Sequence, residues 1–293
     1  MFQTLTQIGL PIALILIMMG VGLGLKASDF SRVFQQPKAF FIGALSQMVL
    51  LPLIAVLIIE AAGLTGELAI GLFILALCPG GVTSNLYSFL CKADVGLSVS
   101  LTAVIGFITP FTIPILGAWA IGHYASESTQ FELPIVVTWI KLMVISVIPV
   151  LIGMGIRAKW EQFALKAEPY VSWFSVFVLA FMIVAICINL GEKLIDFAIL
   201  TGPATIALNL VTMALGYGLG KWLLHNEAQS RTITLEVGLQ NGTLALAVTT
   251  GILGSAPMSM APSIYSLFMF ISATLFTFIV LKKDKAKGLA PAA

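Results

Sequence analysis

Long stretches without charged side chains are the feature of this 293-residue sequence that most limits its fold. A helix of about 20 residues crosses a hydrocarbon core of ~30 Å, and most of these stretches are at least that long. Only 10% of the residues are charged, whereas a soluble domain has about a quarter. A β-barrel would show alternating segments of ~10 residues, which are absent. The sequence therefore predicts an all-α polytopic membrane protein, with charge-free stretches at 1–25, 39–59, 68–91, 95–126, 169–191, 197–220 and 237–281.

Nine membrane-spanning helices are predicted, with short connections and no soluble domain. They cover about 5–25, 38–60, 67–91, 94–122, 134–156, 169–190, 197–222, 229–253 and 258–281.

The distribution of Lys and Arg predicts the orientation, because basic loops stay in the cytoplasm. Thirteen of the fifteen Lys and Arg residues fall on one side of this arrangement. We therefore expect the N-terminus outside the cell and the C-terminus, with a tail over 282–293, in the cytoplasm. The compact loops favour a prokaryotic source, and with it the inner (cytoplasmic) membrane.

Glu236 is a carboxylate inside a membrane stretch that contains no further charged residue before Lys282. A buried ionised carboxylate costs several kcal/mol unless a cation or hydrogen-bond donors satisfy it. Such a residue indicates an ion or proton site. Gln240 follows four residues later and shares its helix face, unless the helix is interrupted between the two.

Two of the predicted spans contain helix-breaking residues at polar centres. Span 67–91 contains Pro79, Gly80 and Gly81, followed by Ser84 and Asn85. Pro removes a helical hydrogen bond, and Gly lowers helix propensity. Span 229–253 contains two glycines around a Gln-Asn pair at 240–241. Interrupted helices in corresponding positions of two halves indicate an inverted-repeat transporter, here with the first four spans paired with the last four and the fifth unpaired.

Two Gly-x-Gly-x-Gly runs, at 20–24 and 216–220, also lie inside predicted spans. Although they resemble the glycine-rich loops of nucleotide-binding proteins, small residues within apolar spans usually allow helices to approach closely. We predict close helix packing at both runs.

The polar residues of the apolar spans are oxygen donors. Ser98 and Thr102 are four residues apart, and Gln47 lies in the middle of the second span. Carboxylate, amide and hydroxyl oxygens, with backbone carbonyls freed at an unwound turn, suit a small hard cation. One negative charge among neutral oxygens favours Na⁺ over Ca²⁺. Alternatively, the Ser and Thr hydroxyls bond to their own helix carbonyls, a solution that an acid does not have.

Three motifs together resemble the bile acid:sodium symporter family, in its bacterial nine-span type. They are Cys78–Asn85, Lys92–Thr102 and Thr234–Asn241, and the resemblance extends over nearly the whole chain. It implies two broken helices that cross near sodium sites. It also implies a panel domain of about 5–25, 134–156 and 169–190 against a core domain of about 38–122 and 197–281.

The resemblance also implies residues for two sodium ions and a substrate. The first sodium site would use Ser84, Asn85, Ser98, Thr102 and Glu236. The second would use Gln47, Glu236 and Gln240, with the backbone carbonyls of Val237 and Leu239. Asn241, with Asn85, Thr83 and Gly242, would contact the substrate.

The function implied is that of a sodium-coupled symporter, not an enzyme. It would import an organic anion, such as a bile acid, a steroid conjugate or a small carboxylate, by alternating access. A proton-coupled or sodium-independent organic-anion carrier is the alternative, and we place an intramembrane enzyme or a receptor below both. The sequence contains no G-x-S-x-G or H-E-x-x-H motif and no long soluble region.

The expected partners are the substrate anion and the lipid bilayer. The net charge of +2 gives no indication of a nucleic-acid partner. We take a monomer as the working expectation.

Overall fold

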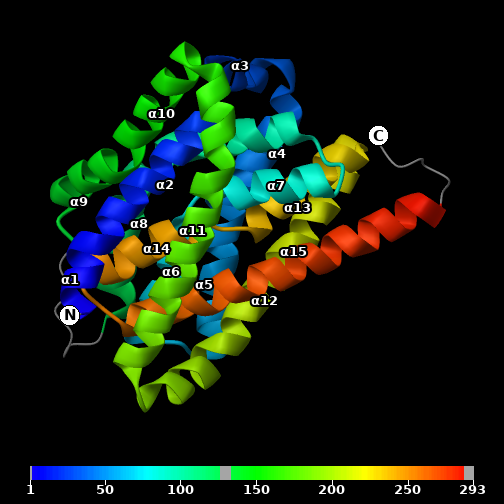
Figure 1. Cartoon of the computed structure of the whole chain (residues 1–293). Coiled ribbons are helices and arrows are strands. Elements are labelled where there is room, and N and C mark those ends of the chain that lie inside the picture. The colour runs from blue at the N-terminus through cyan, green and yellow to red at the C-terminus, as the bar shows by residue number, and fades with distance from the viewer. Residues whose placement is uncertain (1, 126–132, 287–293) are drawn as a thin grey trace.

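The computed structural model describes residues 2–125 and 133–286, in which every regular element is a helix (Figure 1). Helix occupies most of each of the nine predicted spans. Seven helical runs in this part of the chain are long and apolar enough to cross a membrane: Phe2–Gly24, Pro37–Ala62, Val95–Tyr124, Ile135–Lys159, Glu161–Leu190, Lys193–Leu224 and Pro257–Ala286.

Three of these runs contain a π-helical turn that ends two residues before a proline. Proline lacks the N–H of a helical hydrogen bond, and its ring displaces the preceding turn, which accounts for the local widening. The first run comprises α1 (Phe2–Thr4), η1 (Leu5–Gly9) and α2 (Leu10–Gly24). The second comprises α4 (Pro37–Leu45), η2 (Ser46–Leu50) and α5 (Leu51–Ala62), and the fourth α9 (Ile135–Leu142), η3 (Met143–Val147) and α10 (Ile148–Lys159).

The remaining long runs are simpler. They are α8 (Val95–Tyr124), α11 (Glu161–Leu190), α12 (Lys193–Leu224), and α15 (Met260–Ala286) with its leading 3-10 turn η5 (Pro257–Ser259). A short helix, α3 (Ala27–Gln35), connects the first run to the second.

Helix is interrupted at both predicted positions. The first interruption separates α6 (Gly66–Leu77) from α7 (Val82–Leu90). The second separates α13 (Glu227–Gly238) from α14 (Gly242–Leu246), which continues as η4 (Ala247–Ile252). Each gap contains the Pro or Gly residues that disfavour helix in the sequence.

Two predicted boundaries differ from the structure. The span predicted at 169–190 begins at Glu161, because apolarity marks only the part of α11 that lies in lipid while the polar turns before it are helical as well. The predicted tail at 282–293 begins as helix, since α15 continues to Ala286. Residues 287–293 of that tail lie outside the described residues.

The helices form two packed groups. In one, α2 packs against α10 and α11, and these two helices also contact each other (Figure 1). In the other, α12 packs against α13 and α15, and α8 packs against α6, α7 and α13.

Glycines allow close packing of helices within each group, as predicted. A Cβ on Gly22 would lie 2.1 Å from the carbonyl oxygen of Val150, and one on Gly153 would lie 2.1 Å from that of Met19. Helices α2 and α10 therefore touch backbone to backbone. At the second glycine run, a Cβ on Gly220 would lie 2.6 Å from the Cα of Ser230, so α12 and α13 also approach closely.

The two interruptions meet. The backbone N–H of Asn241 donates to the carbonyl oxygen of Pro79 at 2.8 Å, and Gly80 forms an isolated antiparallel bridge with Gln240. Helix α13 lies beside α7, and α14 beside α6 (Figure 1). This contact places the polar residues of both broken helices in one buried region.

Candidate functional site

Glu236 lies in the last turn of α13 and is 1% exposed. Two hydroxyl groups one turn apart on α8 face its carboxylate. The Ser98 hydroxyl lies 2.5 Å from Glu236 Oε1, and the Thr102 hydroxyl donates to Oε2 at 3.0 Å. These side chains do not merely bond to carbonyl groups of their own helix. Their i,i+4 spacing places both hydroxyls beside the Glu236 carboxylate.

Helix α7 supplies further oxygen atoms around this carboxylate. Ser98 Oγ lies 2.8 Å from Asn85 Oδ1, and Ser84 Oγ lies 3.5 Å from Thr102 Oγ1. The structure therefore brings together all five residues of the first predicted sodium site.

Ser88 also belongs to this group, although the sequence analysis did not select it. Its hydroxyl donates to Ser98 Oγ at 3.1 Å, and its side chain is fully buried. The signal that could have identified it is the i,i+4 spacing from Ser84, the same spacing as that of Ser98 and Thr102.

Backbone from the first interruption closes the group. A Cβ on Gly80 would lie 2.6 Å from Glu236 Oε2 and 3.2 Å from Ser84 Oγ. Only glycine allows this approach, because real Cβ atoms do not come so close to an oxygen.

The second predicted set is also assembled, around an amide pair. Gln47 Nε2 donates to Gln240 Oε1 at 2.7 Å and to the carbonyl oxygen of Cys78 at 3.0 Å. Gln240 Nε2 donates to the carbonyl oxygen of Val237 at 2.9 Å. Gln47 Oε1 is buried and has no hydrogen-bond partner among the described residues.

Glu236 contacts this second set through its backbone carbonyl, and Leu239 follows it at the end of α13. Gln240 Nε2 lies 3.5 Å from the carbonyl oxygen of Glu236, whose carboxylate is held instead by the hydroxyls of α8. Leu239 is the extended residue that ends α13, and its N–H donates to Leu235. The two sets therefore share one residue but use different oxygen atoms of it.

The chemistry of these groups fits a small cation. One carboxylate, several hydroxyls and two amides lie within a buried region, and one amide oxygen has no partner. Hydroxyl groups that now donate to Glu236 can rotate and present lone pairs to a cation. Hard oxygen ligands of this kind suit Na⁺, which would compensate the buried negative charge.

A cleft of about 570 Å³ lies between α2 and α11 on one side and α7, α8, α14 and α15 on the other. All four residues predicted to contact the substrate line it: Thr83, Asn85, Asn241 and Gly242. A pocket of this size accommodates a small organic ligand. Glu168 and Trp173 of α11 line the cleft as well, and the sequence analysis assigned neither of them to the substrate.

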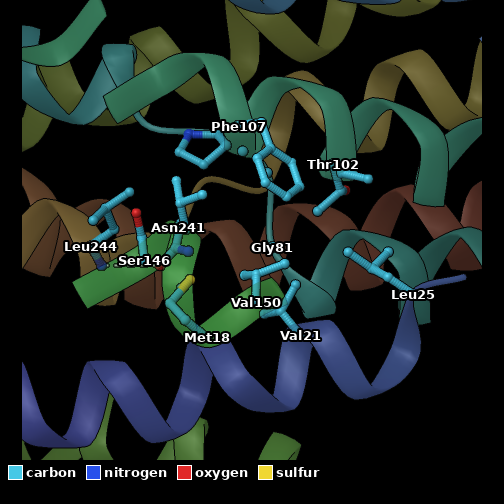
Figure 2. Close-up of a pocket in the computed structure, with 15 residues that line it drawn as sticks. Met18, Val21, Leu25, Gly81, Thr102, Phe107, Ser146, Val150, Asn241 and Leu244 are labelled. Carbon is cyan, nitrogen blue, oxygen red and sulfur yellow. Dashed lines mark hydrogen bonds between the residues drawn. The ribbon is translucent and has the colours of Figure 1, made fainter. Parts of the chain in front are cut away.

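A smaller cavity lies beside this cleft and is lined by Thr102, Gly81 and Asn241 among others (Figure 2). Its volume is about 30 Å³, which is enough for one or two water molecules. Thr102 thus contacts the Glu236 carboxylate and also lines a cavity that shares Gly81 and Asn241 with the cleft.

Comparison with known proteins identifies a match between residues 11–197 and the model of the sodium bile acid symporter family. "Uncharacterized sodium-dependent transporter YocS" of Bacillus subtilis (strain 168) is 28% identical over 275 residues, which are 93% of this chain and 83% of that protein. The ileal sodium/bile acid cotransporter of Oryctolagus cuniculus is 29% identical over 292 residues, covering 95% and 80% of the two chains. "Probable sodium/metabolite cotransporter BASS1, chloroplastic" of Oryza sativa subsp. japonica is 26% identical over 245 residues, covering 84% and 59%.

Proposed function

Because the chain belongs to the sodium bile acid symporter family, we propose that it is a sodium-coupled symporter that imports an organic anion across the membrane. The names of its relatives support sodium-coupled transport, and they include both bile acids and metabolites as substrates. The observation that best supports this function is the buried Glu236 carboxylate, surrounded by oxygen donors at the meeting point of two broken helices. The substrate class is a bile acid, a steroid conjugate or a small carboxylate.

We assign two sodium ions to the two sets of oxygen donors. The first ion binds the Glu236 carboxylate with the side-chain oxygens of α7 and α8, namely Ser84, Asn85, Ser98 and Thr102. The second binds between Gln47 and Gln240, with backbone carbonyls of Glu236, Val237 and Leu239. The partnerless Gln47 Oε1 supports this second assignment.

The transporter crosses the inner membrane nine times, counting each broken helix as one span, and forms an inverted repeat. Helices α2, α10 and α11 belong to the panel, and the remaining spans form the core. The close packing of α2 against α10 and α11, and of α12 against α13 and α15, supports the division. The N-terminus lies outside the cell and the C-terminus in the cytoplasm.

In this orientation the cleft opens toward the cytoplasm. Leu25, Val95 and Glu168, which line it, lie at the cytoplasmic ends of their helices. Rocking of the panel against the core would expose the same cleft to the outside.

Sodium binding couples to substrate binding through the two interruptions. The cation compensates Glu236 and stabilises the contact between the two breaks, which fixes the N-terminal ends of α7 and α14 toward the cleft. These ends have backbone N–H groups and a positive dipole end, which receive the carboxylate or sulfate of the substrate. Two sodium ions with one monoanion move one net positive charge, so that a membrane potential contributes ~2.3 kcal/mol per 100 mV to uptake.

The first prediction concerns sodium and Glu236. Sodium raises the thermal unfolding midpoint of the purified wild-type protein, because it binds the folded state only. The variant Glu236→Gln loses most of this shift, since it removes the charge that attracts the ion. Differential scanning fluorimetry in sodium chloride, with choline chloride at equal ionic strength as the control, measures both effects.

Two outcomes would contradict the proposal. One is the absence of any sodium-dependent stabilisation of the wild type, and the other is a full shift in Glu236→Gln. Uptake of organic anions into proteoliposomes then separates the alternatives. Accumulation driven by a pH gradient without sodium would indicate proton coupling through Glu236. Uptake that only equilibrates the substrate, and is unaffected by either gradient, would indicate a sodium-independent carrier.

A further inference from the structure

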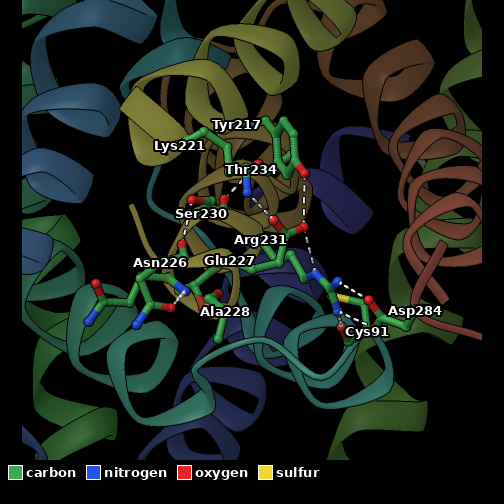
Figure 3. Close-up of polar contacts among 12 residues, drawn as sticks. Cys91, Tyr217, Lys221, Asn226, Glu227, Ala228, Ser230, Arg231, Thr234 and Asp284 are labelled. Atoms are coloured by element: carbon green, nitrogen blue, oxygen red, sulfur yellow. Dashed lines mark hydrogen bonds and ion pairs between the residues drawn. The ribbon is translucent and has the colours of Figure 1, made fainter. Parts of the chain in front are cut away.

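Arg231 forms a buried network at the beginning of α13 and contacts none of the residues assigned to sodium or substrate above (Figure 3). Only 3% of the residue is exposed. Its two terminal nitrogens donate to the two carboxylate oxygens of Asp284, with Nη1 at 2.8 Å and Nη2 at 2.6 Å. Nη1 also donates to the carbonyl oxygen of Cys91 at 2.9 Å, and Nε to Glu227 Oε1 at 3.2 Å. One guanidinium group thus joins α13, α15 and the end of α7.

The same turn of α13 also holds the start of α8. The Thr232 hydroxyl donates to the carbonyl oxygen of Asp94 at 2.9 Å, and the N–H of Asp94 donates to the carbonyl oxygen of Ala228 at 3.2 Å. The Asp94 side chain caps α8 by accepting from the N–H of Leu97 at 3.0 Å. The connection between α7 and α8 is therefore hydrogen-bonded to α13 at both of its ends, Cys91 and Asp94.

These three helices are the ones that supply the oxygen atoms around the Glu236 carboxylate. Helix α7 supplies Ser84 and Asn85, α8 supplies Ser98 and Thr102, and α13 supplies Glu236 itself. Arg231 precedes Glu236 by five residues, which is ~7.5 Å along the helix axis. A shift of α13 relative to α7 and α8 would change the distances from the Glu236 carboxylate to Ser98 and Thr102.

We propose that Arg231, held by Asp284, is a positioning residue that fixes α13 relative to α7 and α8 and thereby sets the affinity of the first sodium site. This inference rests on the proposed function, because it requires that sodium binds at Glu236. The geometry of the pair supports positioning, since two parallel hydrogen bonds from a guanidinium to a carboxylate fix direction as well as distance. A buried ion pair adds little net stability by itself, because the desolvation of both charges offsets their attraction.

The test is a sodium titration of the thermal stability of the full-length protein. Asp284→Asn keeps the size of the side chain but removes the charge that holds Arg231. We expect the sodium concentration at half-maximal stabilisation to rise about tenfold, because the three ligand-bearing helices lose their fixed arrangement. The matched control is Glu161→Gln on α11, which breaks the exposed ion pair between Glu161 and Lys26 (2.7 Å). This variant leaves the half-saturating sodium concentration unchanged.

A second variant covers the case in which Asp284→Asn does not fold. Arg231→Lys keeps the positive charge but loses the bidentate hydrogen bonding to Asp284. Its half-saturating sodium concentration therefore also rises, by a smaller factor.

The outcomes separate this inference from the proposed function. If the variants lower the unfolding midpoint without sodium but leave the half-saturating concentration unchanged, Arg231 stabilises the fold only and the inference is wrong. If sodium does not stabilise even the wild type, the proposed function fails, and the inference fails with it because no sodium site remains to be positioned.

Discussion

At the scale of single residues, the Glu236 carboxylate is satisfied by hydroxyl groups and not by a basic side chain. Ser98 and Thr102 both contact it, and each is at most 4% exposed. A Lys or Arg partner would neutralise the carboxylate permanently and leave no charge for a cation. Neutral hydroxyls keep the negative charge and can turn their lone pairs toward an ion. This choice of partners is what a reversible cation site requires.

Ser98→Ala tests this arrangement. The change removes the 2.5 Å contact with Glu236 and one proposed sodium ligand, so we expect the half-saturating sodium concentration to rise about tenfold. A tenfold change in affinity corresponds to about 1.4 kcal/mol. Sodium titration of the unfolding midpoint measures it.

Ser100→Ala is the matched control on the same helix. Its buried hydroxyl donates to the carbonyl oxygens of Asp29 and Gly96, each at 2.8 Å, and not to Glu236. The half-saturating sodium concentration stays at the wild-type value in this variant. Equal effects of the two substitutions would show that Ser98 has no special role in sodium binding.

At the scale of the helices, the two interruptions create the site by ending helices inside the molecule. Each break leaves backbone groups without helical partners, and the structure joins some of them directly, as in the hydrogen bond from Asn241 to Pro79. The Asn209 side chain satisfies another of these backbone groups, the carbonyl oxygen of Gly238, to which its Nδ2 donates at 2.8 Å. Interrupted backbone is stable at this depth because it is buried in protein and not exposed to lipid.

The adjacent glycines of the first interruption give a matched pair of variants. In Gly80→Ala the new methyl group would lie 2.6 Å from Glu236 Oε2, so it displaces the carboxylate or the backbone. In Gly81→Ala the nearest side-chain atom, Thr83 Oγ1, would lie 3.7 Å away, which is an ordinary contact. We expect Gly80→Ala to abolish most of the sodium-dependent thermal shift and Gly81→Ala to retain it.

Both proteins should be measured at the same sodium concentrations after purification in the same detergent. Because both glycines lie in the interruption between α6 and α7, a difference between the two variants reports the contact with Glu236. A normal sodium response in Gly80→Ala would mean that the carboxylate is not held where the structure places it.

At the scale of the whole molecule, the cleft between the two groups of helices is lined by a negative charge, although its proposed substrate is an anion. Glu168 is the only charged side chain among the described residues that line it, and it is partly exposed. No Lys or Arg of the described chain lines this cleft. An anion in this cleft is therefore received by hydrogen-bond donors and helix ends, with one carboxylate opposing it.

Removal of this carboxylate should strengthen anion binding. Two charges ~4 Å apart interact by about 1 kcal/mol in water, so we expect Glu168→Gln to lower the half-saturating concentration of a transported monoanion by a few-fold. The measurement is sodium-driven uptake into proteoliposomes at a series of substrate concentrations. Glu192→Gln, which changes an exposed acid just before α12 and outside the cleft, serves as the control.

An unchanged or higher half-saturating concentration in Glu168→Gln would contradict the prediction. The higher value would show instead that Glu168 binds a hydrogen-bond donor of the substrate.

Much of the fold was predictable from local sequence. Apolar stretches identify membrane helices because the bilayer penalises any exposed backbone or charge, and this cost depends on each stretch by itself. The interruptions were predictable for the same reason, since Pro79 and the glycines beside it disfavour helix wherever they stand. The beginning of α11 at Glu161 was missed, because helix outside the lipid needs no apolar side chains.

The site was predictable in part. Glu236 was identifiable from one buried charge, and its partners came from a resemblance, not from spacing. Ser88 and Glu168 were missed, because a serine in a helix and an acid near the start of a helix are both common. Only the tertiary structure shows that Ser88 contacts Ser98 and that Glu168 lines the cleft. Arg231 was counted only among the Lys and Arg residues that indicate orientation. Its role depends on Asp284, which is 53 residues further along the chain.

The sequence by itself thus determined the membrane class, the helical segments and the position of both interruptions. Tertiary structure alone decided that the interruptions meet, that Ser98 and Thr102 face an acid more than 130 residues away, and that a cleft forms beside them. The physical reason is the range of the interactions. Transfer of a segment into lipid is a local free energy, whereas the coordination of one carboxylate depends on how three separate helices pack against each other.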